Sequence, residues 1–245
     1  GLVWDPGLGW VNPAEETRYA RGGVYDLQRR GWFGLSEANA FHARPNRSWE
    51  IRTEHLLIHG TADLAVLADA GTQLEAFHRE IFGMYANFFA GSNRLDVLRL
   101  ALGLVDRKPL ELWIYRDREQ YLTETGAPAW TAGYFAPDTG RTYFFGRVSP
   151  TMFHEFTHQI LQVFARTNQA PAWLVEGIAV YTQTATFDRG RVVIPGARPS
   201  AALPLEELLS LDTNAAWLAY HGRNEGPSAY ADAGSLATYC MNADN

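Results

Sequence analysis

Two histidines separated by three residues carry the clearest chemical signal in the sequence. They belong to the motif HEFTH at residues 154–158, in a stretch whose apolar residues recur at helical spacing. Because four residues advance an α-helix by about 400°, His154 and His158 project from nearly one face and could bind one Zn²⁺ ion. Glu155 lies about 100° round the helix, where a general base toward a metal-bound water is needed. Alternatively, the histidines are two satisfied residues of an ordinary core.

Glu176 is the candidate for a third metal ligand. Catalytic zinc sites usually have three protein ligands and a water, so two histidines leave one position to fill. Glu176 follows His158 by 18 residues within the apolar run WLVEGIA. A buried carboxylate among apolar neighbours is costly unless a cation neutralises it. The alternative is an exposed glutamate on the polar side of an amphipathic helix.

Strand patterns come before helix patterns along the chain, which favours an α+β domain. Alternation or β-branched composition predicts one strand from Ser48 to Gly60, another over Leu110–Tyr115, and a hairpin or a bent pair of strands over residues 132–146. Apolar spacing and start signals predict helices over Asp63–Ala90, Asp117–Thr123, residues 150–166, residues 171–183, residues 205–211 and residues 228–242. We therefore expect a sheet-containing part at 48–165 and a helical part at 166–245.

Residues 1–47 form a separate segment rich in Gly, Trp and Arg, with a weak repeat. The tripeptide Gly9-Trp10-Val11 matches Gly31-Trp32-Phe33 at an offset of 22 residues. Two copies are too few for a solenoid, so we expect an N-terminal appendage packed by its tryptophans.

The motifs HEFTH and WLVEGIA together resemble those of gluzincins, the thermolysin-like and peptidase MA-like zinc metallopeptidases. The similarity is greater to an uncharacterised branch of unknown function, in which segments similar to IRTEHLLIHG, LELWIYRDREQYL and AGYFAPDTGRTYFF come before the metal helices. The resemblance runs from about Trp49 to the C-terminus. It implies a zincin-like fold, with a small mixed sheet whose antiparallel edge strand lies above the active-site helix.

The resemblance also implies roles for single residues. His154, His158 and Glu176 would be the zinc ligands and Glu155 the base, while Gly133 to Phe145 would pair with an extended peptide substrate. Tyr230 is our candidate for stabilising the oxyanion, with Tyr220 and His221 as rivals. Thermolysin-like enzymes usually carry an Asp one turn after the glutamate ligand, and Val180 occupies that position here. The branch also leads us to expect a further helix after Met241.

Two other histidines repeat the four-residue spacing without the rest of the motif. His55 and His59 lie in a strand-like run with no neighbouring base or third ligand, so we interpret them as surface or packing histidines.

The composition limits the kinds of partner and site that we expect for this chain. The net charge of −6 argues against a nucleic-acid partner, and no stretch is long and apolar enough for a transmembrane helix. A single cysteine, Cys240, excludes an internal disulfide and a multi-cysteine zinc site. The arginine-rich composition and the resemblance favour an exported, cell-envelope protein whose signal peptide has been removed.

These observations predict a zinc-dependent peptide-bond hydrolase that uses Zn²⁺ and acts on a peptide or protein. The alternative is a catalytically weak or inactive zincin-like binding or scaffold module that keeps a structural zinc, which Val180 favours. The oligomeric state has no signal in the sequence.

Overall fold

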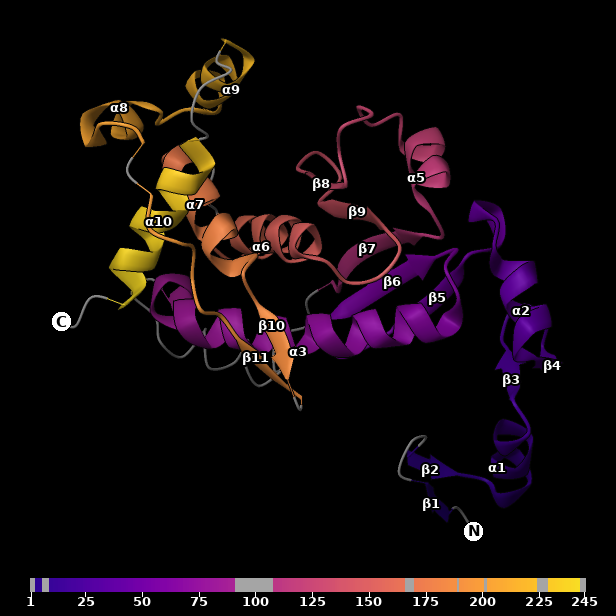
Figure 1. The fold of residues 1–245 in the computed structure, drawn as a ribbon. Helices are drawn as coiled ribbons and strands as arrows, with labels where there is room; N and C mark the ends of the chain where they lie inside the picture. Colours follow the sequence, from indigo (N-terminus) through magenta and orange to yellow (C-terminus); the bar gives the residue numbers. More distant parts are fainter. Residues whose placement is uncertain are drawn as a thin grey trace.

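The fold is described from a computed structural model of the chain (Figure 1). It describes residues 3–5, 9–90, 108–165, 170–188, 190–200, 202–223 and 229–242. Within these residues the chain is a mixed α+β protein with one larger sheet, as its patterns predict. None of the described helices is long and apolar enough to cross a membrane.

The larger sheet has five strands in the order β5-β6-β7-β9-β8. Its strands are β5 Trp49–Arg52, β6 Leu56–Gly60, β7 Leu110–Tyr115, β8 Gly133–Ala136 and β9 Arg141–Phe145. The two central pairings, β6 with β7 and β7 with β9, are parallel, whereas the outer pairings of β5 and β8 are antiparallel. The sheet is therefore mixed, and β8 is an antiparallel edge strand.

The prediction of one strand from Ser48 to Gly60 is wrong, because the segment is a hairpin of β5 and β6. The chain turns at residues 53–55, where the Thr53 amide donates to the Leu56 carbonyl at 3.0 Å. Glu75 from a distant helix accepts hydrogen bonds from the His55 amide at 2.7 Å and from the Thr53 hydroxyl. The turn residues 53–55 include no Gly, Pro or Asn, so the local sequence carries no turn signal, and the turn is stabilised by the carboxylate of Glu75 instead.

Two long helices, α3 Leu64–Ala90 and α6 Pro150–Ala165, contact each other and the sheet. Figure 1 shows α3 running beneath the sheet, with α6 next to it. The Phe77 ring stacks on the Phe153 ring with centroids 4.6 Å apart, and both side chains are buried. Burial of this apolar interface is the main stabilising term for both helices.

A buried glutamine fixes α6 against the sheet. The Gln159 side-chain amide donates to the carbonyl oxygens of Gly140 at 2.7 Å and Glu111 at 3.0 Å, and its own carbonyl accepts from the Thr142 hydroxyl at 2.7 Å. Because each of these bonds is buried or partly buried, losing one would leave a polar group unsatisfied. Gln159 therefore sets the position of the histidines that precede it on α6.

The remaining elements before α6 and after it are mostly helical. They are α5 Arg118–Thr125, α7 Ala172–Thr182, β10 Thr186–Asp188, β11 Arg191–Val193, α8 Leu205–Ser210, α9 Asn214–Arg223 and α10 Ala229–Asn242. The sequence patterns predicted α5, α7, α8 and α10, but not α9 or the β10-β11 hairpin. Strands β10 and β11 have only three residues each, and in α9 the apolar residues form no single stripe, since Trp217 is buried and Leu218 is exposed.

Helices α7 and α10 pack closely because glycines lie at their contact. A Cβ atom on Gly177 of α7 would lie 2.6 Å from the Ala233 carbonyl oxygen of α10. A Cβ atom on Gly234 of α10 would lie 2.3 Å from a methyl group of Val180. The missing side chains let the two backbones approach each other, and the buried Val180 fills the space over Gly234.

The N-terminal repeat corresponds to a repeated structural unit. The first copy consists of β1 Val3–Asp5, β2 Gly9–Val11 and α1 Pro13–Ala20; the second consists of β3 Gly23–Asp26, β4 Gly31–Gly34 and α2 Leu35–His42, followed by the short helix η1 Pro45–Arg47. Each copy is an antiparallel hairpin followed by a helix, and both extend away from the larger sheet (Figure 1). The Trp32 ring packs against Tyr19 and Tyr25, at centroid distances of 4.8 and 5.7 Å.

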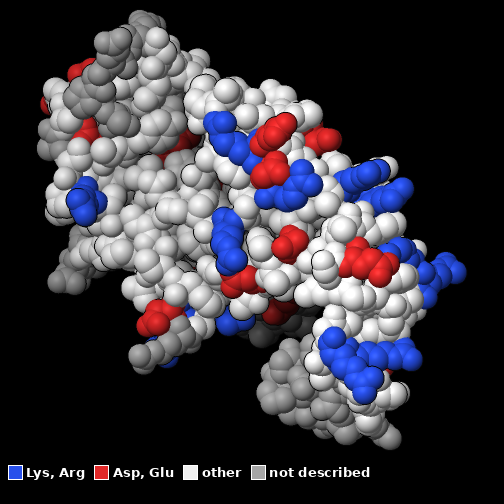
Figure 2. Space-filling view, turned by 45° about the vertical axis from the view of Figure 1, so that its right-hand side comes forward, with Lys and Arg blue, Asp and Glu red and all other residues white. Residues whose placement is uncertain are grey.

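Acidic and basic side chains are interspersed on the face of the molecule drawn in Figure 2. Among the described residues of that face, positive side chains do not form one continuous surface. The prediction that the chain has no nucleic-acid partner stays a prediction.

Candidate metal centre

Helix α6 positions the two histidines and Glu155. The helix begins at Pro150 after Ser149, whose hydroxyl accepts from the Met152 amide at 3.4 Å. The apolar face of α6 is buried against α3 and the sheet. His154 and His158 lie on another face and are only partly buried, with 12% and 15% of their side chains exposed. A ligand can therefore reach both imidazoles.

Helix α7 brings Glu176 to the same point. The Glu176 Oε2 atom lies 3.4 Å from His154 Nε2 and 3.5 Å from His158 Nε2, and the two Nε2 atoms are 3.2 Å apart. Ligands at 2.0–2.1 Å from a tetrahedral zinc ion are separated by about 3.3 Å. The three atoms thus form a triangle of the size that one zinc ion requires, and these residues could hold a metal ion.

The electrostatics of the three residues also suit a cation. The Glu176 Oε2 atom is buried and accepts no hydrogen bond from the described residues. Burial alone would raise the pKa of Glu176, but the two neighbouring imidazoles outweigh burial and lower that pKa to about 2. Burial opposes the charged form of His158, yet Glu176 raises the pKa of this imidazole. A buried oxygen of an ionised carboxylate, with no hydrogen bond from the described residues, is well suited to a positive ligand.

Glu155 contacts the edge strand and lies near the metal-ligand candidates. Its Oε2 atom accepts a hydrogen bond from the Phe135 amide of β8 at 3.0 Å. Burial raises the pKa of Glu155, although His158, His154 and the amide of Phe135 partly oppose that shift. A carboxylate with a raised pKa holds a proton more readily, which suits a general base that must later donate it.

A hydrogen bond to Gln183, a site residue that the sequence patterns did not predict, orients His154. His154 Nδ1 lies 3.1 Å from the Gln183 side-chain oxygen, which can only accept, so Nδ1 carries the proton and Nε2 is free to bind a metal. Gln183 lies at the end of α7, two turns after Glu176. The buried hydroxyls of Thr157 and Thr182, 2.8 Å apart, hold α6 and α7 in register. In the resemblance to thermolysin-like enzymes, an Asp at the position of Val180 would orient a histidine ligand. Here the side chain of Gln183 makes such a contact with His154.

The three candidates for oxyanion stabilisation lie next to one another, and they differ in their contact with His154. The Tyr230 ring of α10 lies next to His154, with centroids 6.3 Å apart. His221 packs behind Tyr230 at 4.6 Å and donates from Nδ1 to the Trp217 carbonyl, while Tyr220 lies beside His221. Burial raises the pKa of Tyr230, and Glu176 raises it further, so its hydroxyl keeps its proton at neutral pH. Of the three, Tyr230 is the one beside a metal-ligand candidate.

A cavity adjoins the centre between α7 and α10. Its volume is about 380 Å³, and its lining includes Val180, Gln183, Arg198 and Tyr230. Gln183 and Tyr230 also lie next to His154, whereas the three metal-ligand candidates do not themselves line the cavity.

Comparison with known proteins adds no family. No protein-family model matches the chain, and no curated protein shows a significant match to it. The similarity to gluzincins therefore stays a prediction made from the motifs.

His55, which the sequence led us to interpret as a surface or packing histidine without a neighbouring base or third ligand, does have such neighbours in space. Its ring contacts Glu75 and His78, both from α3, and these three residues form a second group that could hold a metal ion. His59 stacks on Trp113 at a centroid distance of 4.9 Å and does not belong to that group. Glu75 and His78 lie about 20 residues after His55, so no local motif joins them.

Proposed function

We propose that the chain is a zinc-dependent peptide-bond hydrolase with a zincin-like fold. The observation that carries this proposal is the triangle of His154, His158 and Glu176, whose sides of 3.2–3.5 Å match the spacing of ligands around one tetrahedral zinc ion. Glu155 next to this triangle supplies the base that hydrolysis requires.

A zinc ion held by these three residues would polarise the scissile carbonyl and lower the pKa of water. Glu155 accepts the proton of the attacking water at its carboxylate and passes it to the nitrogen of the leaving amine as the carbon–nitrogen bond breaks. The Phe135 amide holds the Glu155 carboxylate toward β8 during this transfer. Gln183 keeps the proton of His154 on Nδ1.

The edge strand β8 offers a way to bind an extended peptide. The Phe135 amide points toward Glu155, so it faces away from the neighbouring strand β9. An extended chain that adds to this open edge would lie directly beside the base. The segment Gly133 to Phe145 was predicted to pair with the substrate. Strand β9 already pairs with β7 and β8, so we assign this role to β8 alone. Tyr230, with its protonated hydroxyl, is the candidate donor to the carbonyl oxygen.

The proposal is tested by hydrolysis of a mixed peptide library in the presence of zinc. We expect cleavage that a chelator abolishes and that added zinc restores, and a Glu155→Gln variant that binds zinc without cleaving. Zinc binding with no cleavage by the parent protein would support the alternative, a binding or scaffold module. A Glu155→Gln variant as active as the parent would reject the mechanism.

A further inference from the structure

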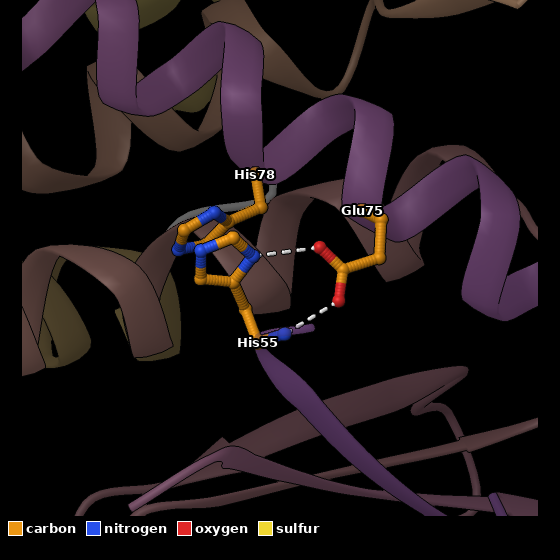
Figure 3. Close-up of side chains that lie close together, drawn as sticks. All are labelled: His55, Glu75 and His78. Atoms are coloured by element: carbon orange, nitrogen blue, oxygen red, sulfur yellow. Dashed lines mark hydrogen bonds and ion pairs between the residues drawn. The ribbon is translucent and has the colours of Figure 1, made fainter. Parts of the chain in front are cut away.

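The group of His55, Glu75 and His78 lies outside the proposed catalytic centre and takes no part in its chemistry. His55 comes just before β6, and the other two residues lie one turn apart on α3 (Figure 3). Each offers one ligand atom, and these atoms lie within 4.8 Å of one another.

His78 is the residue that requires an explanation. Its side chain is buried, with 3% of the residue exposed, and neither ring nitrogen has a hydrogen-bond partner among the described residues. A buried polar group without a partner is destabilising and rare in folded proteins. Burial lowers the pKa of His78 to about 4, so its ring is neutral at pH 7 and keeps a lone pair. A neutral imidazole with a free lone pair is the form of histidine that binds metal ions.

His55 is held in a matching state by Glu75. Its Nδ1 atom lies 2.8 Å from Glu75 Oε2, so Nδ1 carries the proton and the lone pair lies on Nε2. Glu75 Oε1 also accepts from the His55 amide at 2.7 Å, which fixes the carboxylate. A histidine whose second nitrogen donates to a carboxylate is the arrangement found around most metal-binding histidines.

The two rings lie together, with centroids 4.3 Å apart and planes inclined by 25°. Figure 3 shows a nitrogen of each ring on the side of the pair away from Glu75. The lone pairs of stacked rings lie in nearly parallel planes, so His78 must rotate before one ion can bind both nitrogens. This rotation breaks no hydrogen bond to the described residues, because His78 makes none with them. The His55 side chain is 28% exposed, which leaves a path from solvent.

We propose that His55 and His78 form a second divalent-metal site, a zinc site, in which Glu75 positions His55 and water fills the remaining coordination positions. Imidazole ligands favour zinc and neighbouring transition metals over calcium and magnesium. The site joins the β5-β6 turn to α3, so metal binding would tie the hairpin to the helix. It does not depend on the proposed hydrolase activity.

The test is the zinc content of purified protein after loading with Zn²⁺ and removal of unbound metal. We expect about two zinc ions per chain in the parent and about one in His78→Phe or His55→Asn. Phenylalanine suits the apolar surroundings of His78, since Phe82 and Phe164 lie 5.7 and 5.8 Å from its ring. Asparagine at position 55 keeps a donor toward Glu75 and removes the ligand nitrogen. The matched control is His59→Asn, which should keep about two ions.

A double variant, His154→Asn with His158→Asn, separates this site from the proposed catalytic centre. It should keep about one zinc ion, and adding His78→Phe should remove that ion as well. In this background we also expect Zn²⁺ to raise the urea midpoint of unfolding, and His78→Phe to abolish the rise. If either His78→Phe or His55→Asn keeps the zinc content of the parent, the second site is rejected while the first stands. If the double variant keeps two ions, the first site fails independently.

Discussion

Replacement of Gly177 by alanine tests how the packing of α7 against α10 places Glu176. The new methyl group would lie 2.6 Å from the Ala233 carbonyl oxygen and 3.0 Å from its carbon, whereas ordinary contacts begin at 3.4 Å. The obstacle is backbone, which cannot rotate away, so one helix must move by about 0.8 Å or distort. Glu176 is the preceding residue, and its carboxylate would move with α7.

The size of the effect follows from two opposing terms. Overpacking by one methyl group costs about 1–3 kcal/mol, and alanine in place of glycine inside a helix returns up to about 1 kcal/mol. We therefore expect Gly177→Ala to lower the free energy of unfolding by up to about 3 kcal/mol. The matched control is Gly83→Ala on α3, where the position is exposed and a methyl group would meet nothing within 4 Å.

Urea or thermal unfolding of the two variants measures the difference directly. Gly83→Ala should be as stable as the parent or more stable by up to about 1 kcal/mol, and Gly177→Ala should be less stable than Gly83→Ala by about 1–3 kcal/mol. For a protein of this size, 1 kcal/mol corresponds to about 2–4 °C in Tm. We also expect weaker zinc binding in Gly177→Ala. If Gly177→Ala is as stable as Gly83→Ala, the close packing of α7 and α10 is not as described.

Three further predictions concern other parts of the structure. Glu155→Gln should keep zinc and lose peptide hydrolysis by about 10²-fold or more, measured by metal analysis together with initial rates. Gln183→Ala removes the acceptor of His154 Nδ1 and should weaken zinc binding about 10–100-fold in competition with a chelator, whereas Gln162→Ala, which alters an exposed contact to the Pro137 carbonyl, should not. Asp26 has a pKa below its ordinary value of 3.8, because bonds from Arg29 and His42 outweigh the burial that would raise it. Its contribution to stability is present above that value and lost as pH falls through the folded pKa, so the stability difference between the parent and Asp26→Asn should shrink as pH falls below 3.8. A difference that does not change with pH would contradict this reading of Asp26.

Local patterns predicted much of the fold. Strand β7 has the predicted bounds, and α3 begins one residue from the predicted start, because both have strong periodicity. The hairpin of β8 and β9 follows from alternation interrupted by Asp138-Thr139-Gly140. The β5-β6 turn was missed because Glu75, which fixes it, lies 20 residues from His55 and belongs to another element.

In the candidate site too, residues set by local spacing could be predicted, and residues set by the packing of distant elements could not. His154, His158 and Glu155 could be predicted because their spacing on one helix decides which side chains share a face. Glu176 required an argument about a carboxylate in an apolar run. Gln183 could not be predicted, because its contact with His154 depends on how α6 and α7 cross, and a glutamine at a helix end is ordinary in sequence. The His78 group depends in the same way on the approach of a strand to a helix.

The most direct test of the central claim is an anomalous difference map, collected at the zinc absorption edge from crystals of the zinc-loaded protein. We predict a peak about 2.0–2.1 Å from the Nε2 atoms of His154 and His158 and at a similar distance from a carboxylate oxygen of Glu176. Zinc-loaded crystals with no peak at these three side chains, or with Glu176 turned away from both imidazoles, would contradict it.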